Sequence, residues 1–327
     1  MTGALVRRAC GSIICVMTMM IITGAAFAYP DRPMRLIVGF PAGGDTDVLA
    51  RIMADAMAPI LGHPIIVDNK PGADAQIAVS NLKNSPADGY SMMMVSVNFA
   101  AGNKKVYPEL PYDQLNDFVP VVQIAETPTL LFASKTLGVD TFGQFVELAK
   151  NQPRKLNSGY TSATVNLTKQ SAFESLMGIS ATPISYKGTP DLILALIRGD
   201  IAYALTSPIP FVSIVAERKV VALATIAKTR ATNFPDVPTI YELGVPQLAV
   251  IPPGWWGIIA KAGTPREIIE KWNAAANAAL KNPEVRARLE RVGASVVVGT
   301  PEEFAAVVRS SFAIYEKWTQ EFWIIQR

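Results

Sequence analysis

Histidine and cysteine are scarce in this chain of 327 residues, and their scarcity excludes several kinds of chemistry. His63 is the single histidine, so a histidine metal cluster cannot form and only one imidazole base is open to a serine triad. Its surroundings, Gly62-His63-Pro64, are typical of an exposed turn after a helix. A nucleophile elbow, G-x-S-x-G, is missing as well. We therefore predict no catalytic residue and no metal, and a secreted α/β hydrolase is the weakest alternative.

The N-terminus has the pattern of a secretory leader. Arg7-Arg8 precede a short apolar stretch over residues 13–22, and Ala26-Phe27-Ala28 has the form of a cleavage site. This pattern predicts a signal peptide over residues 1–28, a mature chain that starts at Tyr29, and a periplasmic location of the Gram-negative type. The alternative is an uncleaved membrane anchor, for which the apolar stretch is short.

The mature chain lacks cysteine and lacks any excess of one charge. Cys10 and Cys15 both lie in the leader, so no disulfide, thiol nucleophile or cysteine metal ligand remains. The whole chain has 30 basic and 27 acidic residues, and without Arg7 and Arg8 the balance is 28 to 27, a net charge of +1. No basic block is present, so we expect no nucleic-acid partner. A mature length of 299 residues is enough for two domains.

Phosphate-loop and dinucleotide fingerprints are absent, and a different glycine turn organises the first half. The apolar run Leu36–Phe40 leads through Pro41–Gly44 into a helical pattern over Thr46–Leu61. A strand, a glycine turn and a helix start in that order present backbone N–H groups and the positive end of a helix dipole to an anion. Gly43 and Gly44 have no side chains, so a ligand oxygen could approach their amides closely. A plain strand-to-helix turn is the alternative.

Strand and helix patterns alternate along the chain, which predicts an α/β fold with a parallel sheet in the first unit and a second α/β unit after it. The first unit is expected to contain Met34–Phe40, Thr46–Leu61, Ile65–Asp68, Asp74–Ser85 and Ser91–Val97. The second is expected to contain Thr129–Ala133, Thr141–Asn151, Lys155–Ser158, Asn166–Met177, Ile184–Ser185, Pro190–Arg198 and Ile201–Leu205. A strand over Gly257–Ala260 and helices over Arg266–Leu280, Pro283–Val292 and Pro301–Phe322 complete the chain.

The second unit repeats the glycine turn of the first in another form. A strand, Lys155–Ser158, leads through the small and hydroxyl-rich loop Gly159–Thr164 into the helix at Asn166. Ligands of such sheets bind at the carboxyl ends of the strands. Two anion-friendly loops from separate units would then face each other across a cleft.

A series of short motifs runs in one order through the mature chain. They are Tyr29-Pro30-Asp31-Arg32-Pro33-Met34-Arg35-Leu36-Ile37-Val38, Phe40-Pro41-Ala42-Gly43-Gly44-Asp45-Thr46-Asp47, Asp68-Asn69-Lys70-Pro71-Gly72-Ala73, Ala87-Asp88-Gly89-Tyr90, Leu110-Pro111-Tyr112-Asp113, Asp117-Phe118, Tyr186-Lys187-Gly188, Phe234-Pro235-Asp236-Val237-Pro238-Thr239, Trp256-Gly257, Ala262-Gly263-Thr264-Pro265 and Thr300-Pro301-Glu302-Glu303-Phe304. Together they resemble the solute receptors of tripartite tricarboxylate transporters, also called the Bug family. The resemblance implies a two-domain periplasmic binding protein of the Venus-flytrap, type II-like kind with two hinge strands. It also implies capture of a small organic acid between the domains for a membrane permease, with no cofactor.

The resemblance also implies domain limits and a binding site. The first domain would cover residues 29–124 and 252–327, and the second residues 125–251. In the family the ligand carboxylate is held mainly by backbone amides of the glycine loop and by ordered water, and the opposite domain adds the loop that here is Ser158–Thr164. We therefore expect ligand contacts from Phe40, Ala42, Gly43, Gly44, Asp45, Thr46, Asp47, Ala73, Asp74, Ser96, Tyr160, Thr161, Ser162, Thr164, Tyr186 and Thr206.

The chain departs from the family pattern where specificity would be set. Asp45 stands where relatives usually have a small residue, and Asp74 lies in a loop that usually continues Pro-Gly-Ala-Gly-Gly-Asn. A common histidine is absent near Asn166, and a common acidic residue is replaced near Thr206. If either aspartate faced the cleft, charge repulsion would favour a ligand with one carboxylate and an amine, amide or hydroxyl over citrate. We expect the alternative, in which both aspartates point to solvent as helix caps.

Aromatic residues are expected near the cleft, namely Phe99, Tyr160, Tyr186, Trp255 and Trp256. They could enclose a flat ring or pack the hinge. We expect packing for Trp256 and ligand contact for Tyr160, which replaces a small residue in an open loop.

The sequence thus predicts a periplasmic solute receptor without catalytic activity. Its ligand would be a small organic carboxylate, with aromatic, amino and hydroxy acids as candidates, and its partner the membrane permease of a tripartite transporter. A monomer is expected. The main alternative is an extracytoplasmic sensor that signals to a kinase.

Overall fold

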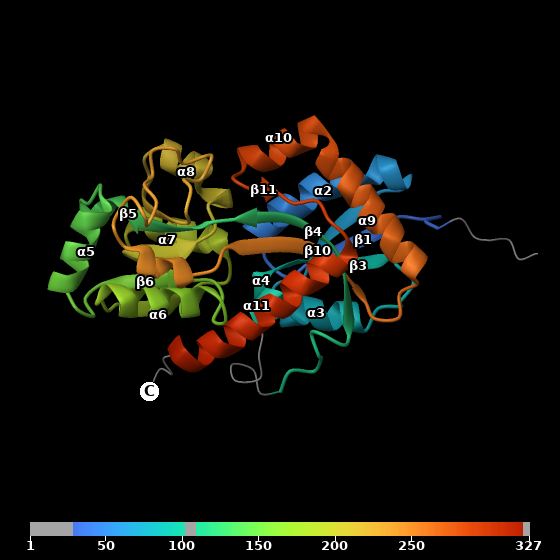
Figure 1. The fold of residues 1–327 in the computed structure, drawn as a ribbon, viewed down its shortest axis with the longest axis horizontal. Helices are drawn as coiled ribbons and strands as arrows, with labels where there is room; N and C mark the ends of the chain where they lie inside the picture. The colour runs from blue at the N-terminus through green and yellow to red at the C-terminus, as the bar shows by residue number, and fades with distance from the viewer. Residues whose placement is uncertain (1–28, 102–108, 323–327) are drawn as a thin grey trace, which may run out of the picture. The chain divides into compact units, whose positions relative to one another are not determined.

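The computed structural model describes residues 29–101 and 109–322, and its described residues from Arg32 onward form one compact unit, to which all that follows refers. Two sheets organise this unit (Figure 1). The first sheet contains β1 (Met34–Val38), β2 (Ile65–Asn69), β3 (Ser91–Ser96), β4 (Phe118–Thr127), β10 (Gly254–Lys261) and β11 (Ser295–Val296), in the order β11-β4-β10-β3-β1-β2. The second contains β5 (Thr129–Ser134), β6 (Asn157–Tyr160), β7 (Thr182–Ser185), β8 (Tyr203–Thr206) and β9 (Val220–Ile226), in the order β7-β6-β8-β5-β9.

Helices cover both sheets and define two lobes. The first lobe comprises the first sheet with α2 (Asp45–Leu61), α3 (Gln76–Lys83), α4 (Val97–Ala101), α9 (Arg266–Lys281), α10 (Pro283–Arg291) and α11 (Pro301–Phe322). The second lobe comprises the second sheet with α5 (Phe142–Asn151), α6 (Asn166–Met177), α7 (Thr189–Arg198), α8 (Val212–Ala216) and the 3-10 turns η1 (Lys135–Leu137), η2 (Ile209–Phe211) and η3 (Pro246–Val250). Figure 1 shows α2, α9 and α10 on one side of the first sheet and α3, α4 and α11 on the other. The predicted α/β class with two sheets is confirmed.

Each sheet mixes parallel and antiparallel pairs. β1 is parallel to β2 and β3, and β6 is parallel to β7 and β8, as the alternating patterns predict. β10 is antiparallel to both β3 and β4, and β5 is antiparallel to both β8 and β9. The first sheet was predicted to be parallel, which is wrong for β4, β10 and β11, and β4, β9 and β11 were missed as strands. These strands lie at or next to the crossings between lobes, where the strand-helix-strand repeat is interrupted.

Prolines mark both crossings between the sheets. β4 ends at Thr127 and β5 begins at Thr129, so Pro128 alone separates them. On the return, Pro252 and Pro253 precede β10. Proline has no N–H to donate to a strand ladder, so each of these positions lacks one ladder hydrogen bond at the point where the chain leaves a sheet. The two hinge strands of the predicted fold class are present, whereas the domain limits at 124/125 and 251/252 stay a prediction.

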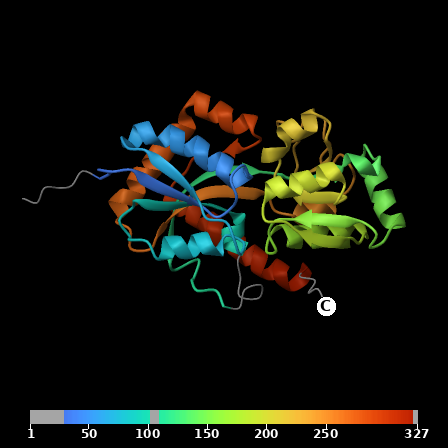
Figure 2. The same ribbon diagram turned by 180° about the vertical axis from the view of Figure 1, so that it is seen from behind.

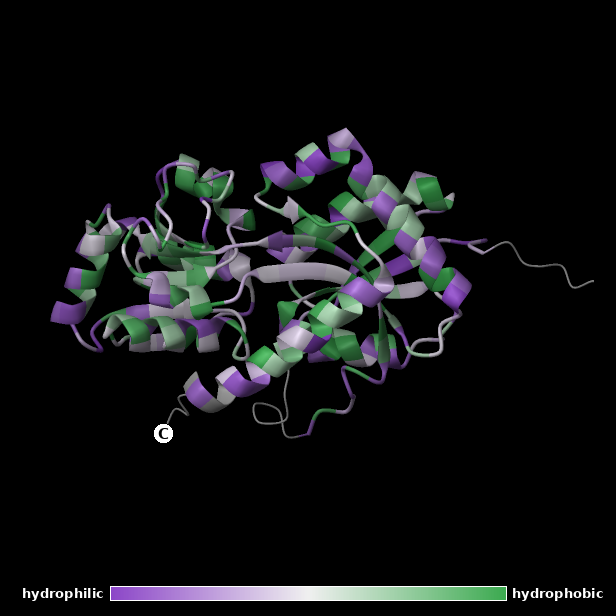
Figure 3. Cartoon of the chain, in the orientation of Figure 1, coloured by the Kyte–Doolittle hydropathy of each residue, from purple (hydrophilic) through white to green (hydrophobic). Residues whose placement is uncertain are grey.

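The cores follow from the period-2 alternation of the strands. On β5, Leu131 and Ala133 belong to one buried cluster of the second lobe, and Leu130 and Phe132 belong to another on the opposite face. The first cluster lies with α5 and α6, and the second with α7 and η2. Figure 3 shows polar and apolar residues alternating along the helices of both lobes, as is typical of helices with one buried face.

The C-terminal helix α11 contributes to the cores of both lobes. Tyr315 belongs to a core cluster of the first lobe, whereas Trp318 belongs to a cluster of the second lobe. Their ring centroids are 6.3 Å apart. In Figures 1 and 2 this helix, drawn in red, extends from the first sheet toward α6. It is therefore a third connection between the lobes besides the two strand crossings.

Candidate functional site

The glycine turn before α2 is closed by the chain's own aspartates. The N–H of Gly43 donates to Asp47 Oδ2 at 2.9 Å, and the N–H of Thr46 donates to Asp45 Oδ1 at 2.8 Å. The N–H of Gly44 makes a longer bond of 3.4 Å to the carbonyl of Pro41. The amide of Gly43, which we expected to bind the ligand carboxylate, therefore already has an acceptor within the turn.

Asp47 braces this turn. Its side chain is buried, and its carboxylate also accepts bonds from Arg51 Nε at 3.0 Å and Nη2 at 2.9 Å and from Asn69 Nδ2 at 2.9 Å. Burial acts to raise the pKa of Asp47, but the bonds from Arg51, Gly43 and Asn69 outweigh it and hold the pKa below its ordinary value. Asp47 therefore stays ionised and fixes the loop.

The turn before α6 is closed by an aspartate from the other lobe. Ser162 Oγ and Thr164 Oγ1 donate to Asp74 Oδ2 at 2.8 and 3.0 Å, and Asn98 Nδ2 reaches Asp74 Oδ1 at 3.4 Å. Burial, only partly offset by these bonds, raises the pKa of Asp74. The expectation that Asp74 points to solvent as a helix cap was wrong, because its carboxylate joins the first lobe to the second.

The backbone before α3 explains why Asp74 does not cap a helix. Ala73, Asp74 and Ala75 have φ angles of 47°, 52° and 70°, so three successive non-glycine residues are left-handed. A helix cannot begin in this conformation, and α3 starts at Gln76 rather than at Asp74 as predicted. Glycine adopts left-handed φ without strain, whereas other residues pay roughly 1–2 kcal/mol. The chain keeps Asp74 in a costly conformation that carries its carboxylate to the opposite lobe.

A small cavity lies between the carboxyl ends of the two sheets, and we call it the interlobe cavity. Its volume is about 50 Å³. The first lobe lines it with Phe40, Asp45, Thr46, Ser96, Val97, Asn98, Gly254 and Trp256, and the second lobe with Thr161, Val165, Asn166, Lys169, Thr189, Thr206 and Ser207. Hydroxyl and amide groups predominate in this lining. Such an enclosed, polar site between lobes suits a small hydrogen-bonding ligand.

Six of the predicted site residues meet at this cavity: Phe40, Asp45, Thr46, Ser96, Thr161 and Thr206. Three others, Asp74, Ser162 and Thr164, form the interlobe bonds described above. Gly43 and Asp47 brace the turn, Gly44 is buried beside them, and Ala42 and Ala73 are exposed outside the cavity. Tyr160 and Tyr186 are partly buried and are not part of the cavity lining.

The aromatic residues differ in their position relative to the interlobe cavity. Tyr160, which we expected to contact ligand, ends β6 outside the cavity lining, and Tyr186 packs against a core cluster of the second lobe. Trp256, which we expected only to pack, lines the cavity while its Nε1 donates to Thr46 Oγ1 at 3.1 Å. Phe99 and Trp255 pack in the first-lobe core, where the Trp255 Nε1 donates to Ser311 Oγ at 2.9 Å.

Asp45 faces the interlobe cavity, contrary to the expectation that it caps α2 toward solvent. It occupies the first turn of α2, where a negative charge suits the helix dipole, and its Oδ1 accepts from the neighbouring Thr46 N–H. Burial raises the pKa of Asp45, and the bonds from Thr46 only partly offset this effect. The position of Asp45 in the first turn of α2 led to the capping interpretation. The backbone at this position instead directs the side chain into the cavity.

Lys169, on the second turn of α6, is the residue that sequence analysis missed. Its side chain is 3% exposed, and Nζ donates to Thr129 Oγ1 at 2.9 Å. Burial lowers the pKa of Lys169 to about 7. A signal was present in the sequence, because a cation near a helix start opposes the dipole and such local conflicts concentrate at functional sites.

The two lobes also touch at a glycine. A Cβ added to Gly188, which precedes α7, would lie 2.8 Å from Pro41 Cγ in the glycine turn of the first lobe. Gly188 has φ −175° and ψ 173°, an extended conformation that any residue adopts. The absence of a side chain is therefore needed for the approach of the lobes and not for the local backbone.

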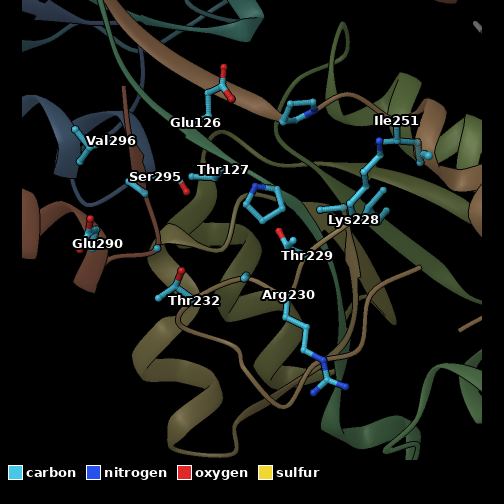
Figure 4. A pocket seen from close by; sticks show the side chains of 18 of the residues that line it. Glu126, Thr127, Lys228, Thr229, Arg230, Thr232, Ile251, Glu290, Ser295 and Val296 are labelled. Atoms are coloured by element: carbon cyan, nitrogen blue, oxygen red, sulfur yellow. The ribbon is translucent and has the colours of Figure 1, made fainter. Parts of the chain in front are cut away.

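A larger cavity of about 520 Å³ surrounds the strand crossings (Figure 4). Thr127, Pro128, Ile251 and Pro253 line it together with residues of α10 and β11, and none of the predicted site residues does. Its charges are largely balanced within the chain. Arg230 points away from the centre in Figure 4. Its Nη2 pairs with Glu242 Oε1 at 2.8 Å, and Arg286 Nη1 lies 3.8 Å from Glu290 Oε1. Size alone therefore does not make it the binding site, because it holds no buried charge that a ligand would compensate.

The described part of the chain gives little support for histidine chemistry, a metal site or a membrane-spanning helix. His63 is half-buried in the turn between α2 and β2 and is absent from the lining of both cavities. Residues 29–101 and 109–322 contain no cluster of three His, Cys, Asp or Glu side chains that could hold a metal ion. None of their helices is both long and apolar enough to span a membrane. The predicted leader lies outside the described residues.

Comparison with known proteins places the chain. Residues 49–321 match the model of the tripartite tricarboxylate transporter family receptor. The chain belongs to this family. It is 31% identical to protein BugT of Bordetella pertussis over 286 residues, which cover 85% of this chain and 86% of that protein.

Two solved structures of Rhodopseudomonas palustris proteins show the same fold. Rpa4515 with adipate is 29% identical, with a TM-score of 0.86 and coverage of 89% of this chain and 97% of that one. MatC with bound malate is also 29% identical, with a TM-score of 0.82 and coverage of 89% and 99%. The chain is thus a solute-binding receptor with a two-domain binding-protein fold. The prediction that it is not an enzyme is confirmed, because the family consists of substrate-binding receptors.

Proposed function

We propose that this receptor captures a small organic acid in the interlobe cavity and that Lys169 binds the ligand carboxylate. The observation that carries the proposal is a buried lysine in a cavity between the lobes, with the hydroxyl of Thr129 as its bonding partner. A carboxylate placed there would form a charge-assisted hydrogen bond with Nζ and restore the charged state that burial disfavours. The hydroxyl and amide groups around it supply further donors.

Two findings support this assignment over the glycine-turn amides. The Gly43 amide and the hydroxyls of Ser162 and Thr164 bond to the chain's own aspartates, so none is free to receive a ligand without breaking those bonds. The similar proteins solved with adipate and malate hold carboxylic acids. We infer that this chain does the same, with its carboxylate site shifted to α6.

The proposed route of the ligand begins with export. Residues 1–28 act as a signal peptide, the mature chain works as a monomer in the periplasm, and closure of its two domains presents the ligand to a tripartite-transporter permease. The predicted domains, 29–124 with 252–327 and 125–251, would be the moving bodies. Closure would bury the ligand and report its presence to the partner.

Calorimetric titration of the mature protein with mono-, di- and hydroxycarboxylates tests the proposal. At least one of these acids should bind the wild type, and Lys169→Met should weaken that acid by about 30-fold or more, because a buried charge loses its partner. Lys150→Met, an exposed change on α5, is the matched control and should bind as the wild type does. Equal affinity of Lys169→Met and wild type for every acid would refute the assignment.

A further inference from the structure

Asp45 and Lys169 are opposite charges that share the interlobe cavity without forming an ion pair. Asp45 comes from the start of α2 in the first lobe, and Lys169 from α6 in the second. The hydrogen bonds of Asp45 come from the neighbouring Thr46, and that of Lys169 goes to Thr129. Among the described residues, no ionic partner contributes to the pKa of either group, and burial is the largest influence on both.

Two unpaired charges in one enclosed site are expensive for the empty protein. Removing an ion from water is costly even after the surroundings relax, and only a close opposite charge with good geometry offsets that cost. Asp45 and Lys169 lie too far apart to offset one another as a salt bridge. A ligand that brought an anion to Lys169 and a cation to Asp45 would offset both costs at once.

We propose that the ligand is a small zwitterionic amino carboxylate, whose carboxylate binds Lys169 and whose ammonium group binds Asp45. This inference rests on the proposed function, because it uses the same cavity and the same carboxylate site. It adds the second charge of the ligand and assigns Asp45 as the residue that determines specificity.

The remaining lining agrees with one anion and one cation. Among the described residues that line the cavity, Lys169 is the single cationic side chain and Asp45 the single anionic one. A dicarboxylate would therefore bring its second carboxylate toward Asp45, where like charges repel in a poorly solvated site. The cavity volume of about 50 Å³ favours a ligand of few heavy atoms.

The position of Asp45 is fixed by its neighbours. Its Oδ1 is held by the Thr46 N–H at 2.8 Å, and the Thr46 hydroxyl is in turn fixed by Trp256 Nε1 at 3.1 Å. Both Thr46 and Trp256 are buried. The carboxylate is thus oriented before the ligand arrives, as a specific binding site requires.

Calorimetric titration with charge-matched ligands tests the proposal. β-Alanine is compared with butyrate, in which a methyl group replaces the ammonium, and with succinate, in which a carboxylate replaces it; L-alanine and isobutyrate form a second pair. The wild type should bind at least one amino acid about tenfold or more tighter than its uncharged analogue. Asp45→Asn should weaken the binding of that amino acid by about 30-fold and remove the preference for it over its uncharged analogue.

The control is Asp191→Asn, which removes an exposed acid from the first turn of α7 and should leave the preference unchanged. Thermal unfolding of each variant shows whether it is folded. If Asp45→Asn does not fold, the wild-type comparison of β-alanine with butyrate and of L-alanine with isobutyrate decides alone.

The outcomes separate the two proposals. Equal or tighter binding of butyrate, isobutyrate or succinate, lost in Lys169→Met and unaffected by Asp45→Asn, would overturn the zwitterion and leave the carboxylate receptor standing. Amino-acid binding that Lys169→Met leaves unchanged would overturn the carboxylate site. Failure of the wild type to bind any amino acid or carboxylate would overturn both.

Discussion

The two turns that lead into α2 and α6 are alike in sequence pattern, yet they are completed in opposite ways. The α2 turn is closed from within, since Asp47 and Asp45 lie on the helix that the turn begins. The α6 turn has no acid of its own and receives Asp74 from the other lobe. The first arrangement stabilises one lobe, whereas the second bridges the two lobes. A helix start that could bind an anion can therefore already be satisfied by a carboxylate of the chain.

The largest effect is expected from removing the internal brace. Asp47→Ala should lower the free energy of unfolding by about 3 kcal/mol, because the Gly43 N–H and the Arg51 and Asn69 side chains all lose one buried acceptor. Urea denaturation measures this loss. Asp55→Ala, an exposed acid on the same helix whose partner is Arg288, should cost less than about 1 kcal/mol. Equal losses in the two variants would contradict the brace.

The charge of Lys169 predicts a pH dependence of stability. Below pH 7 the folded and unfolded chains both hold the proton and the burial cost is complete. As the pH rises from about 7 toward 10, the folded lysine releases its proton while the unfolded one keeps it, so stability increases by up to about 1.4 kcal/mol per pH unit. Urea denaturation at pH 7 and pH 9 should show a rise about 2 kcal/mol larger in the wild type than in Lys169→Met. If the stability of the wild type and of Lys169→Met changed with pH in the same way, a neutral buried Lys169 would be excluded.

A side chain at Gly188 is expected to keep the lobes apart. Its Cβ would meet Pro41 at 2.8 Å, so Gly188→Ala should weaken ligand affinity by about tenfold and raise the radius of gyration in X-ray scattering while the protein stays folded. Gly143→Ala in α5 is the control, since its Cβ meets nothing within 4 Å. Wild-type affinity and size in Gly188→Ala would show that the contact is not needed for closure.

Asp74→Asn should have the smallest effect, on closure more than on folding. Asparagine tolerates a left-handed backbone but offers one acceptor oxygen instead of two, so the closed arrangement should lose about 1 kcal/mol. X-ray scattering from ligand-free Asp74→Asn should show a larger radius of gyration than the wild type, a change in the same direction as that expected for Gly188→Ala. Asp74→Asn could instead lower the free energy of unfolding as much as Asp47→Ala does and leave the scattering unchanged. That result would contradict the distinction between Asp47, which stabilises one lobe, and Asp74, which joins the two lobes.

Sequence reasoning found the elements that local rules determine. α6 occurs with the predicted bounds, and β1, β2, α2 and α5 occur within two residues of theirs, because apolar periodicity and turn residues specify them. β4 and β9 were missed because their neighbours in the sheets come from distant parts of the chain. The hydrophobic pattern of a short stretch of sequence carries no information about which distant strands pair with it.

Sequence reasoning placed several of the predicted residues near one another but did not predict the directions of two aspartate side chains. Six predicted residues meet at the cavity because both turns lie at the carboxyl ends of strands. The directions of Asp45 and Asp74 could not be read, since a first-turn acid is explained equally well by capping. Lys169 was missed because the polar sequence of α6 does not show that most sides of this helix are buried.

The anchoring of α11 in both cores has a consequence for any movement between the lobes. Opening must either draw the Trp318 indole out of the second lobe's core or bend the helix beyond Tyr315, and losing a core tryptophan's packing costs about 3–5 kcal/mol. The two crossing strands alone would allow rotation about an axis through them, whereas a third attachment removes much of that freedom. Any separation of the lobes would therefore have to supply the free energy of this packing in addition to the changes at the two strand crossings.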